Sequence, residues 1–501
     1  MHIPSPSSLA SNYLAMSSDI FVVPAFGQGH LLPCIELCKH LASLNFKTTL
    51  LIFSNLYSSI PVSFIQYPLI EVAQIQSPPP SSLPPFLRLK EDKTRLVSAL
   101  ESLLSTRTHT DLPVCAVVDV AIVMEWTVEI FGKFKVPTIG FFTSSACSVA
   151  VELATWKYGG DFRLLPGLLE RMALTESDLK RRPGGPNGGG GGNSSSPGGP
   201  RKIGPPNPLG RPQWVDDVEE SIALMINTCD DLERPLIRYL ANEVGKPVWG
   251  VGPLLPELYW KSAGSLVRDG EIRPNRKSNV TEDEVISWLD SKPKKSVLYI
   301  SFGTELGPEM DEYPHLANAL EEWTGPFIWV IQPGPGRLGP PRQLSGSDVE
   351  FPSGFQEKVG ERGLIISGWA PQLLILSHPS TGGFLSHCGW NSTMEAIVSH
   401  CGWNSTMEAI VRGVPFLAWP ILDDQVENAK LVVNHMKIGY IVSDVDWITK
   451  DNLTKGIERL MGDEEMKGRA AIICSKFKDG FPSTSLGSLD AFKNFINQRI
   501  G

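Results

Sequence analysis

Residues 19–53 read DIFVVPAFGQGHLLPCIELCKHLASLNFKTTLLIF, and this stretch decides the fold. Its first six residues, Asp19–Pro24, are almost continuously apolar, which is typical of a buried strand. A glycine-containing turn follows, and residues 31–44 then carry apolar side chains at helical spacing. The apolar segment 47–53 predicts a second strand. A strand, a helix and a strand in this order predict a βαβ unit, and therefore a parallel sheet covered by helices.

The same alternation continues in two separate blocks of the chain. In the first block, segments 115–120 and 136–142 predict strands on either side of a helix at 125–134. The second block begins near Ser296. There, the segments that predict strands are 296–303, 327–331 and 363–369, with a helix predicted at 315–323. Two such blocks predict an α/β protein with two doubly wound domains.

Composition gives the predicted boundaries of these domains. We expect a flexible N-terminal extension at 1–18, a first domain at 19–250, an interdomain linker at 251–281, a second domain at 282–480 and a C-terminal helix at 481–501. The C-terminal helix is expected to pack back on the first domain. Residues 182–201, RPGGPNGGGGGNSSSPGGPR, predict a low-complexity surface loop, because this sequence cannot bury enough apolar surface to order itself.

Overall composition excludes several classes of function. The chain has 501 residues, of which 42% are hydrophobic and 20% charged, values typical of a soluble protein with two or more domains. A net charge of −9 argues against a nucleic-acid-binding protein. The sequence contains no run of about 20 apolar residues, the length that a membrane span needs. Residues 1–18 lack the features of a secretory signal. We therefore expect a cytoplasmic protein whose eight cysteines are reduced core thiols.

Segments 386–398 and 399–411 are identical, and each reads SHCGWNSTMEAIV. Two copies of a thirteen-residue segment do not predict a solenoid, which needs several stacked units. One helix running through both copies would be roughly 20 Å longer and would deliver the following strand at the wrong face of the sheet. We therefore expect one copy to occupy the fold and the other to loop out, at a cost of about 2 kcal/mol plus a constant.

The run from Trp369 to Gln425 resembles the signature box of the plant family-1 UDP-sugar glycosyltransferases. The resemblance rests on WAPQ at its start, HPSTGGFLSHCGWNSTMEAIV in its middle and VPFLAWPILDDQ at its end. GQGH, VVD, FFTSSA, SFGT and the helical tail also fall in their family places, so the resemblance covers essentially the whole chain. The family has the repeated segment only once.

This resemblance implies the GT-B fold, in which two Rossmann-like domains face each other across a cleft. It also implies inverting transfer of a sugar from a UDP-sugar to a small acceptor. No metal is expected, and no cofactor either, since the UDP-sugar is a co-substrate.

The UDP-sugar site is expected where the strand at 381–387 ends and the next helix begins, because a helix N-terminus offers free N–H groups and a partial positive charge to phosphates. An ordinary strand–helix turn with an Asn or Ser cap is the alternative for this segment alone. By resemblance, the expected contacts are His387, Asn391 and Ser392 to the phosphates, Trp369, Ala370 and Gln372 to uracil, Glu395 to ribose, Trp390, Asp424 and Gln425 to the sugar, and Thr143 and Ser301 to sugar or phosphate. A terminal glutamine such as Gln425 usually accompanies glucose in this family.

The acceptor hydroxyl needs a base, and His30 in GQGH lies on the turn after the first strand, at the carboxyl edge of the sheet. A histidine suits proton abstraction because its pKa lies near neutrality. Asp119 ends another strand at the same edge, and by resemblance it orients His30. Taken alone, GQGH could be only a tight turn, and Asp119 could be only a helix cap.

Since the two copies are identical, either one can hold the phosphates. We expect the first, Ser386–Val398, to do so, because the excess residues would then leave at the helix C-terminus, away from the phosphates. A zinc site built from His387-Cys388 and His400-Cys401 is an alternative, since these are zinc ligands. Their spacing, however, follows from the copying alone.

The predicted function is transfer of a sugar, expected to be glucose, from UDP-glucose or a related UDP-sugar to a small hydrophobic hydroxylated acceptor, such as a phenolic, flavonoid or terpenoid. The alternative is a UDP-sugar-binding homologue that the duplication has disabled. A nicotinamide-dependent oxidoreductase does not fit, because AFGQGH lacks the third glycine of GxGxxG. The sequence does not identify the acceptor, because variable surface loops carry that specificity.

Overall fold

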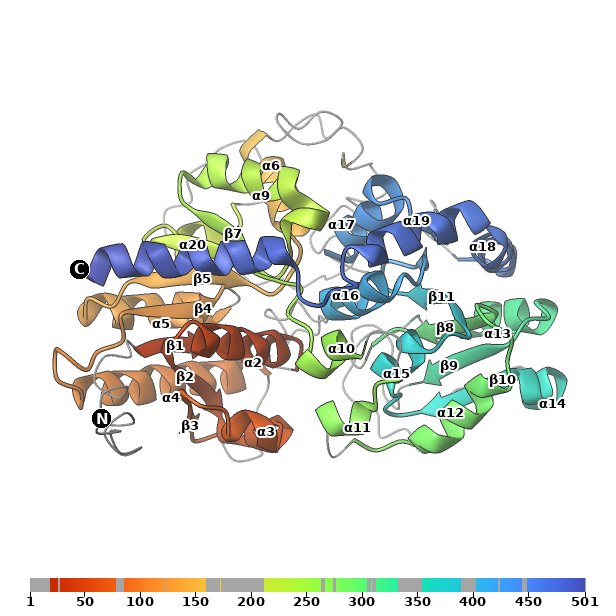
Figure 1. Cartoon of the computed structure of the whole chain (residues 1–501), viewed down its shortest axis with the longest axis horizontal. Coiled ribbons are helices and arrows are strands. Elements are labelled where there is room, and N and C mark those ends of the chain that lie inside the picture. The colour runs from red at the N-terminus through yellow and green to blue at the C-terminus, as the bar shows by residue number, and fades with distance from the viewer. Residues whose placement is uncertain are drawn as a thin grey trace, which may run out of the picture.

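The chain forms two α/β lobes side by side (Figure 1). The computed structural model describes residues 19–25, 28–77, 85–120, 122–158, 172, 211–262, 266–273, 276–303, 308, 312–331, 354–388, 402–421, 424–443 and 448–500. The extension predicted at 1–18 and the low-complexity loop predicted at 182–201 lie outside these residues.

The first lobe contains a parallel sheet with seven strands in its described part (Figure 1). They are β1 (Asp19–Val23), β2 (Lys47–Phe53), β3 (Ile70–Ile75), β4 (Cys115–Asp119), β5 (Thr138–Phe142), β6 (Ala223–Ile226) and β7 (Val248–Gly250). Their spatial order is β3-β2-β1-β4-β5-β6-β7. The order reverses between β1 and β4, and α/β sheets bind ligands outside the carboxyl ends of the strands at such a switch point.

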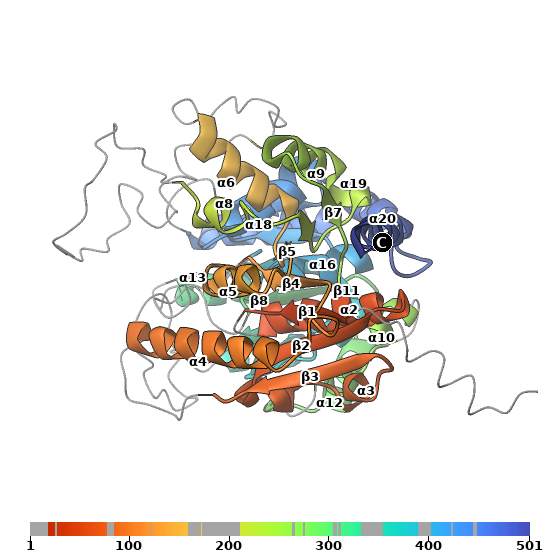
Figure 2. The same cartoon turned by 90° about the vertical axis from the view of Figure 1, so that its left-hand side faces the viewer.

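Helices cover both faces of this sheet (Figure 2). They are α2 (Gln28–Ser43), α3 (Val62–Ile65), α4 (Pro85–Ser105), α5 (Ile122–Lys133), α6 (Ala146–Tyr158), α8 (Gln213–Asp217), α9 (Asp230–Val244) and the 3-10 helix η1 (Ser54–Ser59). Ile20 and Val22 of β1 belong to the core formed with α2, whereas Phe21 and Val23 belong to the core formed with α4 and α5. The continuous apolar run of β1 is explained by burial on both faces.

The second lobe repeats this plan with a six-stranded parallel sheet, counted over the described ranges. Its strands are β8 (Val297–Ser301), β9 (Phe327–Ile331), β10 (Gly363–Ser367), β11 (Thr381–Ser386), β12 (Phe416–Ala418) and β13 (Gly439–Ile441). Their order is β10-β9-β8-β11-β12-β13, so the switch point lies between β8 and β11. The predicted α/β fold with two Rossmann-like sheets is confirmed.

The second sheet is also covered by helices, and shorter helices connect the lobes (Figure 1). The covering helices are α12 (Glu282–Asp290), α13 (Tyr313–Glu322), α14 (Phe355–Val359), η3 (Gly360–Arg362), α15 (Gln372–Ser377), α16 (Gly402–Arg412), α17 (Asp424–Lys430), the π-helical η4 (Leu431–His435), α18 (Lys450–Gly462) and α19 (Glu464–Ser475). The connecting segment holds α10 (Glu257–Lys261) and α11 (Asp269–Ile272), and α20 (Ser483–Ile500) ends the chain against the first lobe.

The helix that follows β11 comes from the second copy of the repeat. β11 and the adjoining His387-Cys388 belong to the first copy, whereas α16 begins at Gly402 and runs into Arg412. Residues 389–401 between them, again thirteen in number, lie outside the described part of the chain. The prediction that the first copy supplies this helix is therefore wrong.

The end of α16 explains why. Arg412, which follows only the second copy, donates hydrogen bonds to the Tyr259 carbonyl oxygen at 2.5 Å and to Ser262 Oγ at 2.6 Å. Gly413 then ends the helix with a φ of 69°, a left-handed conformation that glycine adopts without strain. A helix built from the first copy would place Ser399 where Arg412 stands, and it would lose both hydrogen bonds.

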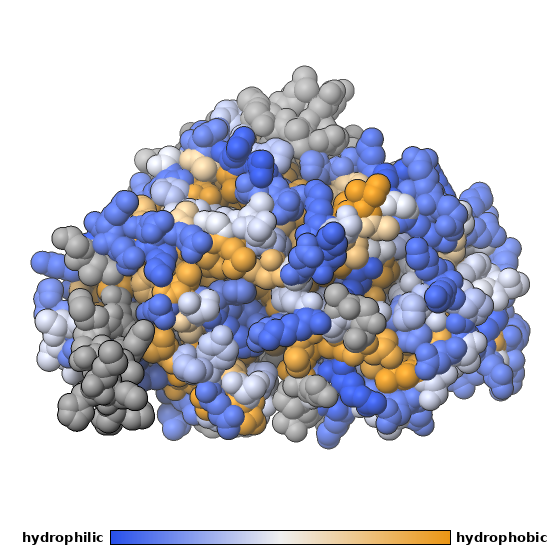
Figure 3. All heavy atoms as spheres, viewed as in Figure 1, coloured by the Kyte–Doolittle hydropathy of each residue, from blue (hydrophilic) through white to orange (hydrophobic). Residues whose placement is uncertain are grey.

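No helix in the described ranges has the length and apolarity that a bilayer span requires. The described cysteines are all free, and all but the half-buried Cys474 are buried, as expected for core thiols in this part of the chain. On the face drawn in Figure 3, apolar side chains are scattered among hydrophilic ones, as on ordinary protein surfaces.

Candidate active site

The switch point of the first sheet carries His30, Asp119 and Thr143. His30 lies in the first turn of α2, and Asp119 is the last residue of β4. His30 Nδ1 is 2.7 Å from Asp119 Oδ2, and both side chains are completely buried. Thr143 Oγ1 lies 3.1 Å from the same nitrogen. Because a carboxylate only accepts hydrogen bonds, Nδ1 carries the proton and the imidazole is held in one orientation.

The switch point of the second sheet carries His387 and Ser301, which follow β11 and end β8 respectively. Burial lowers the pKa of His387 to about 3, so the imidazole is neutral. Its Nδ1 atom is buried and has no hydrogen-bond partner among the described residues. Behind it stands Gly303, where a Cβ would lie only 3.1 Å from Nε2. An unpaired buried nitrogen is costly, and it therefore points to a ligand at this edge of the sheet.

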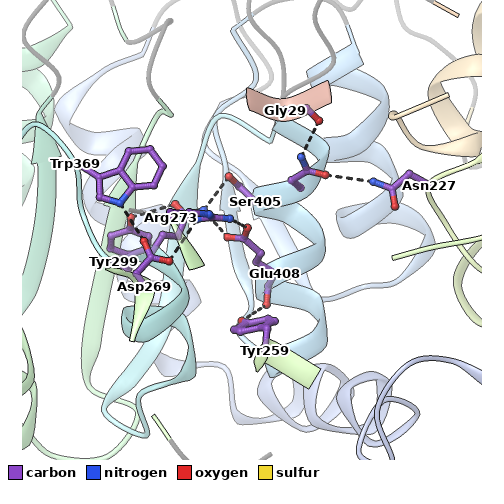
Figure 4. Close-up of polar contacts among 11 residues, drawn as sticks. Gly29, Asn227, Tyr259, Asp269, Arg273, Tyr299, Trp369, Ser405 and Glu408 are labelled. Atoms are coloured by element: carbon purple, nitrogen blue, oxygen red, sulfur yellow. Dashed lines mark hydrogen bonds and ion pairs between the residues drawn. The ribbon is translucent and has the colours of Figure 1, made fainter. Parts of the chain in front are cut away.

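The N-terminus of α16 meets the first lobe directly (Figure 4). Asn404 donates from Nδ2 to the Gly29 carbonyl oxygen at 3.1 Å, and its Oδ1 accepts from Asn227 Nδ2 at 3.2 Å. Trp403 Nε1 donates to the Asn227 carbonyl oxygen at 2.7 Å. Since Gly29 precedes His30, the helix N-terminus of one lobe lies beside the histidine of the other.

A second group of polar side chains lies along α16 (Figure 4). Gln372 Nε2 donates to Ser405 Oγ at 2.9 Å and to Glu408 Oε2 at 2.8 Å. Its Oε1 accepts from the Tyr299 hydroxyl at 3.1 Å. Trp369 stands beside this group, three residues before Gln372 in the chain. The side-chain oxygen of Gln372 is thus held by Tyr299 of strand β8, and its amide nitrogen by two residues of helix α16.

Helix α17 places Asp424 and Gln425 in its first turn. Gln425 Oε1 accepts from the Ile421 backbone N–H at 2.7 Å, and Asp424 Oδ2 accepts from Asn428 Nδ2 at 3.1 Å. The same Nδ2 lies 3.0 Å from the Cys388 carbonyl oxygen, and Asn428 Oδ1 accepts from Ser145 Oγ of the first lobe at 2.7 Å. Asn428 therefore ties α17 both to the end of β11 and to the other lobe.

Comparison with known proteins identifies the class of enzyme. The model described as UDP-glucoronosyl and UDP-glucosyl transferase matches residues 266–399 and 393–486, so the match restarts inside the repeat. Scopoletin glucosyltransferase of Nicotiana tabacum is 27% identical over 89% of this chain and 90% of its own length. UDP-glycosyltransferase 73C3 of Arabidopsis thaliana is 35% identical over 49% of this chain and 47% of its own length. The chain is a UDP-glycosyltransferase, similar to the plant enzymes of that class.

Solved structures agree with the fold of this glycosyltransferase. A protein from O. sativa in complex with UDP has a TM-score of 0.71 at 22% identity, over 95% of this chain and 100% of that chain. UGT71G1 of Medicago truncatula, complexed with UDP-glucose, has a TM-score of 0.68 at 22% identity, over 96% of this chain and 98% of that chain. The predicted GT-B fold is confirmed.

The structure of the glycosyltransferase divides the predicted site residues into two sets. The described ones are His30, Asp119, Thr143, Ser301, Trp369, Ala370, Gln372, His387, Asp424 and Gln425. Trp390, Asn391, Ser392 and Glu395 lie outside the described residues. Their counterparts in the second copy are Trp403, Asn404, Ser405 and Glu408, which lie on α16 in the positions just described. The identical sequences made this shift of thirteen positions invisible beforehand. His400 and Cys401 are also outside the described residues, so the zinc hypothesis stays untested.

Sequence reasoning missed four residues of this region. Asn227 and Asn428 join the two lobes, and no local pattern marks either of them. Asp269 and Arg273, in the connecting segment, contact Trp369 and Glu408. Their opposite charges four positions apart were the available signal, although such pairs are common on solvated helices.

Proposed function

We propose that this UDP-glycosyltransferase transfers glucose from UDP-glucose to a hydroxyl group of a small hydrophobic plant metabolite. One observation carries the proposal: the buried His30–Asp119 pair, at 2.7 Å, adjoins the N-terminus of α16 through the contact of Asn404 with Gly29. The base for the acceptor, His30, thus lies beside the positively polarised end of a helix, which can stabilise the leaving diphosphate.

In the proposed mechanism, His30 takes the proton of the acceptor hydroxyl. Asp119 holds Nδ1, so the proton goes to Nε2, and the carboxylate then stabilises the imidazolium. The acceptor oxygen attacks the anomeric carbon as the bond from that carbon to the diphosphate oxygen breaks, which inverts the configuration. The departing UDP gains negative charge, and the N–H groups at the start of α16 and the neutral His387 stabilise it. No metal or cofactor takes part.

The nucleotide and the sugar are assigned to the remaining residues of the site. We assign uracil to Trp369, Ala370 and Gln372, ribose to Glu408, and the phosphates to His387, Asn404 and Ser405. The sugar is assigned to Trp403, Asp424, Gln425, Thr143 and Ser301. The pairing of Asp424 with Gln425 supports glucose as the transferred sugar.

Named relatives guide the choice of acceptors. One relative is named a scopoletin glucosyltransferase, and similar structures are described as glucosylating indoxyl or as complexed with pterostilbene. These three compounds lead the acceptor panel. We further propose that the enzyme works in the cytoplasm, where its buried free cysteines stay reduced.

Turnover of UDP-glucose with this acceptor panel, with and without EDTA, tests the proposal. His30→Ala is expected to lower kcat by about 10²–10⁴-fold, because a positioned base contributes that factor, while UDP affinity measured by calorimetry stays unchanged. His109→Ala, an exposed histidine of the same lobe, is the matched control. UDP binding without turnover of any acceptor would instead favour the alternative of a disabled sugar-binding homologue. Unchanged turnover in His30→Ala would refute the assignment of the base.

A further inference from the structure

The connecting segment holds the backbone of Trp369 in place. Trp369 N–H donates to the Lys277 carbonyl oxygen at 2.9 Å, and Ser278 forms an antiparallel bridge with Gly368. Gly368 has a φ of 90°, and a Cβ at this position would stand 2.8 Å from the Lys277 oxygen. Only glycine allows this close approach, so the segment and the residue before the tryptophan are fitted to each other.

Side chains of the same segment contact Trp369 and Glu408, the residues proposed to bind uracil and ribose (Figure 4). Asp269 Oδ2 accepts from Trp369 Nε1 at 3.0 Å. Arg273 Nη2 donates to Glu408 Oε1 at 2.5 Å. The two residues also face each other, with 3.7 Å between Arg273 Nη1 and Asp269 Oδ1. The Arg276 guanidinium lies 4.6 Å from the centre of the Trp369 ring.

These charges are buried at a cost. Asp269 is 1% and Arg273 is 8% exposed. Burial raises the pKa of Asp269 to about 6, although Arg273 opposes the shift. Burial also disfavours the charge of Arg273, yet Glu408 and Asp269 raise its pKa above the ordinary value. Apolar side chains of similar volume usually stabilise a fold at least as well as a buried ionic group. Fastening the connecting segment to the second lobe therefore does not require charged residues here.

We propose that Asp269 and Arg273 are positioning residues that orient Trp369 and Glu408 for the uridine half of the donor. The inference rests on the proposed assignment of these two residues to uracil and ribose. Arg273 holds one oxygen of Glu408 and Gln372 holds the other. Each carboxylate oxygen keeps a further lone pair, so the oriented carboxylate can accept hydrogen bonds from both ribose hydroxyls. The pair Asp269–Arg273 thus determines how well the site distinguishes ribose from deoxyribose.

Binding of UDP, 2′-deoxy-UDP and pyrophosphate to the full-length enzyme, measured by calorimetry, tests this inference. The wild type is expected to prefer UDP over 2′-deoxy-UDP by about tenfold or more, the worth of one hydrogen bond to a charged group. Arg273→Met should weaken UDP binding by about tenfold or more and abolish that preference, with pyrophosphate binding unchanged. Arg273→Lys should restore part of the preference. Arg268→Met is the matched control. Arg268 lies in the same segment and forms an exposed ion pair with Asp283 of α12, so its loss should leave the binding of all three ligands unchanged.

A second variant covers the case in which Arg273→Met does not fold. Asp269→Asn keeps the size of the side chain and should raise the KM for UDP-glucose while leaving kcat and the KM of the acceptor unchanged. If Arg273→Met keeps the wild-type ratio of UDP to 2′-deoxy-UDP affinity, or a folded Asp269→Asn keeps the wild-type KM for UDP-glucose, the inference is wrong and the proposed function stands. If the wild type binds no UDP, both the proposed function and this inference fail.

Discussion

His387 and Glu408 come from different copies of the same thirteen-residue sequence. His387 is buried at the end of β11, and Glu408 is buried on α16 beside Arg273. Their counterparts His400 and Glu395 lie in the segment outside the described residues. At the scale of single residues, the proposed UDP site therefore takes its histidine from the first copy and its acid from the second.

This division predicts opposite results for the two copies. His387→Ala and Glu408→Gln should each weaken UDP binding by about tenfold or more, because each removes a hydrogen bond to a polar group of the ligand. His400→Ala and Glu395→Gln should bind UDP as the wild type does. Each pair contains its own control, since the local sequences are identical. Calorimetry with UDP measures all four. A loss in Glu395→Gln with none in Glu408→Gln would show that the first copy forms the helix in solution. Deleting either copy gives the same chain, so only substitutions can answer this question.

At the scale of elements, a side chain of α9 binds the N-terminus of α6. Glu233 Oε1 accepts from the Cys147 N–H at 2.7 Å, and Oε2 accepts from the Ala146 N–H at 3.3 Å. Glu233 reaches them from a break in α9, where its φ is −133°, two residues before Pro235. Burial raises the pKa of this carboxyl to about 7, even though the backbone N–H groups favour the charged form. Desolvation therefore outweighs the helix N-terminus here.

The raised pKa of Glu233 predicts a pH-dependent stability. The pKa is about 7 in the folded state against 4.5 for the free group, so the protonated carboxyl contributes stability that is complete below pH 4.5 and is lost as the pH rises through 7. The loss should reach about 3 kcal/mol, at about 1.4 kcal/mol per pKa unit. The glutamine of Glu233→Gln stays neutral at every pH. The Tm of this variant minus that of the wild type should therefore increase between pH 5 and pH 8. Glu219→Gln, an exposed site, is the control. Parallel Tm curves for the wild type and Glu233→Gln would contradict this account.

At the scale of the whole molecule, the end of the chain completes the core of its beginning. Helix α20 follows the second lobe, yet it lies along the first (Figure 1). Phe492 is fully buried, and its ring centre is 5.9 Å from those of Phe46 and Trp249. Leu489 and Ile496, one turn away on either side, belong to the same core as α2. The hydrophobic core of the first lobe is therefore incomplete without helix α20.

Phe492→Ala tests this dependence. Removing a buried phenylalanine side chain should lower the free energy of unfolding by about 3–5 kcal/mol. Leu486→Ala, on the same helix but 48% exposed, should change it by less than about 0.5 kcal/mol. Urea unfolding followed by circular dichroism measures both variants. Equal effects of the two substitutions would mean that α20 does not pack on the first lobe in solution.

The sequence by itself determined the two α/β lobes and the edges of the sheets at which polar residues gather. Apolar periodicity is a local property, so β1, α2, β2, β8 and β9 lie where it predicted them. His30 and Asp119 are 89 positions apart, and both could be placed at one edge because the carboxyl ends of parallel strands meet there.

The tertiary structure decided which copy of the repeat becomes α16 and what the connecting segment does. Two identical segments have the same intrinsic preference for a helix, so local sequence cannot choose between them. The choice falls to contacts beyond the repeat, such as those of Arg412 with Tyr259 and Ser262. Asp269 and Arg273 read as members of a polar linker because the partners that bury them, Trp369 and Glu408, lie 100 and 135 positions away in the chain. Burial and ion pairing across such separations are set by the packing of the connecting segment against the second lobe, which no local pattern encodes.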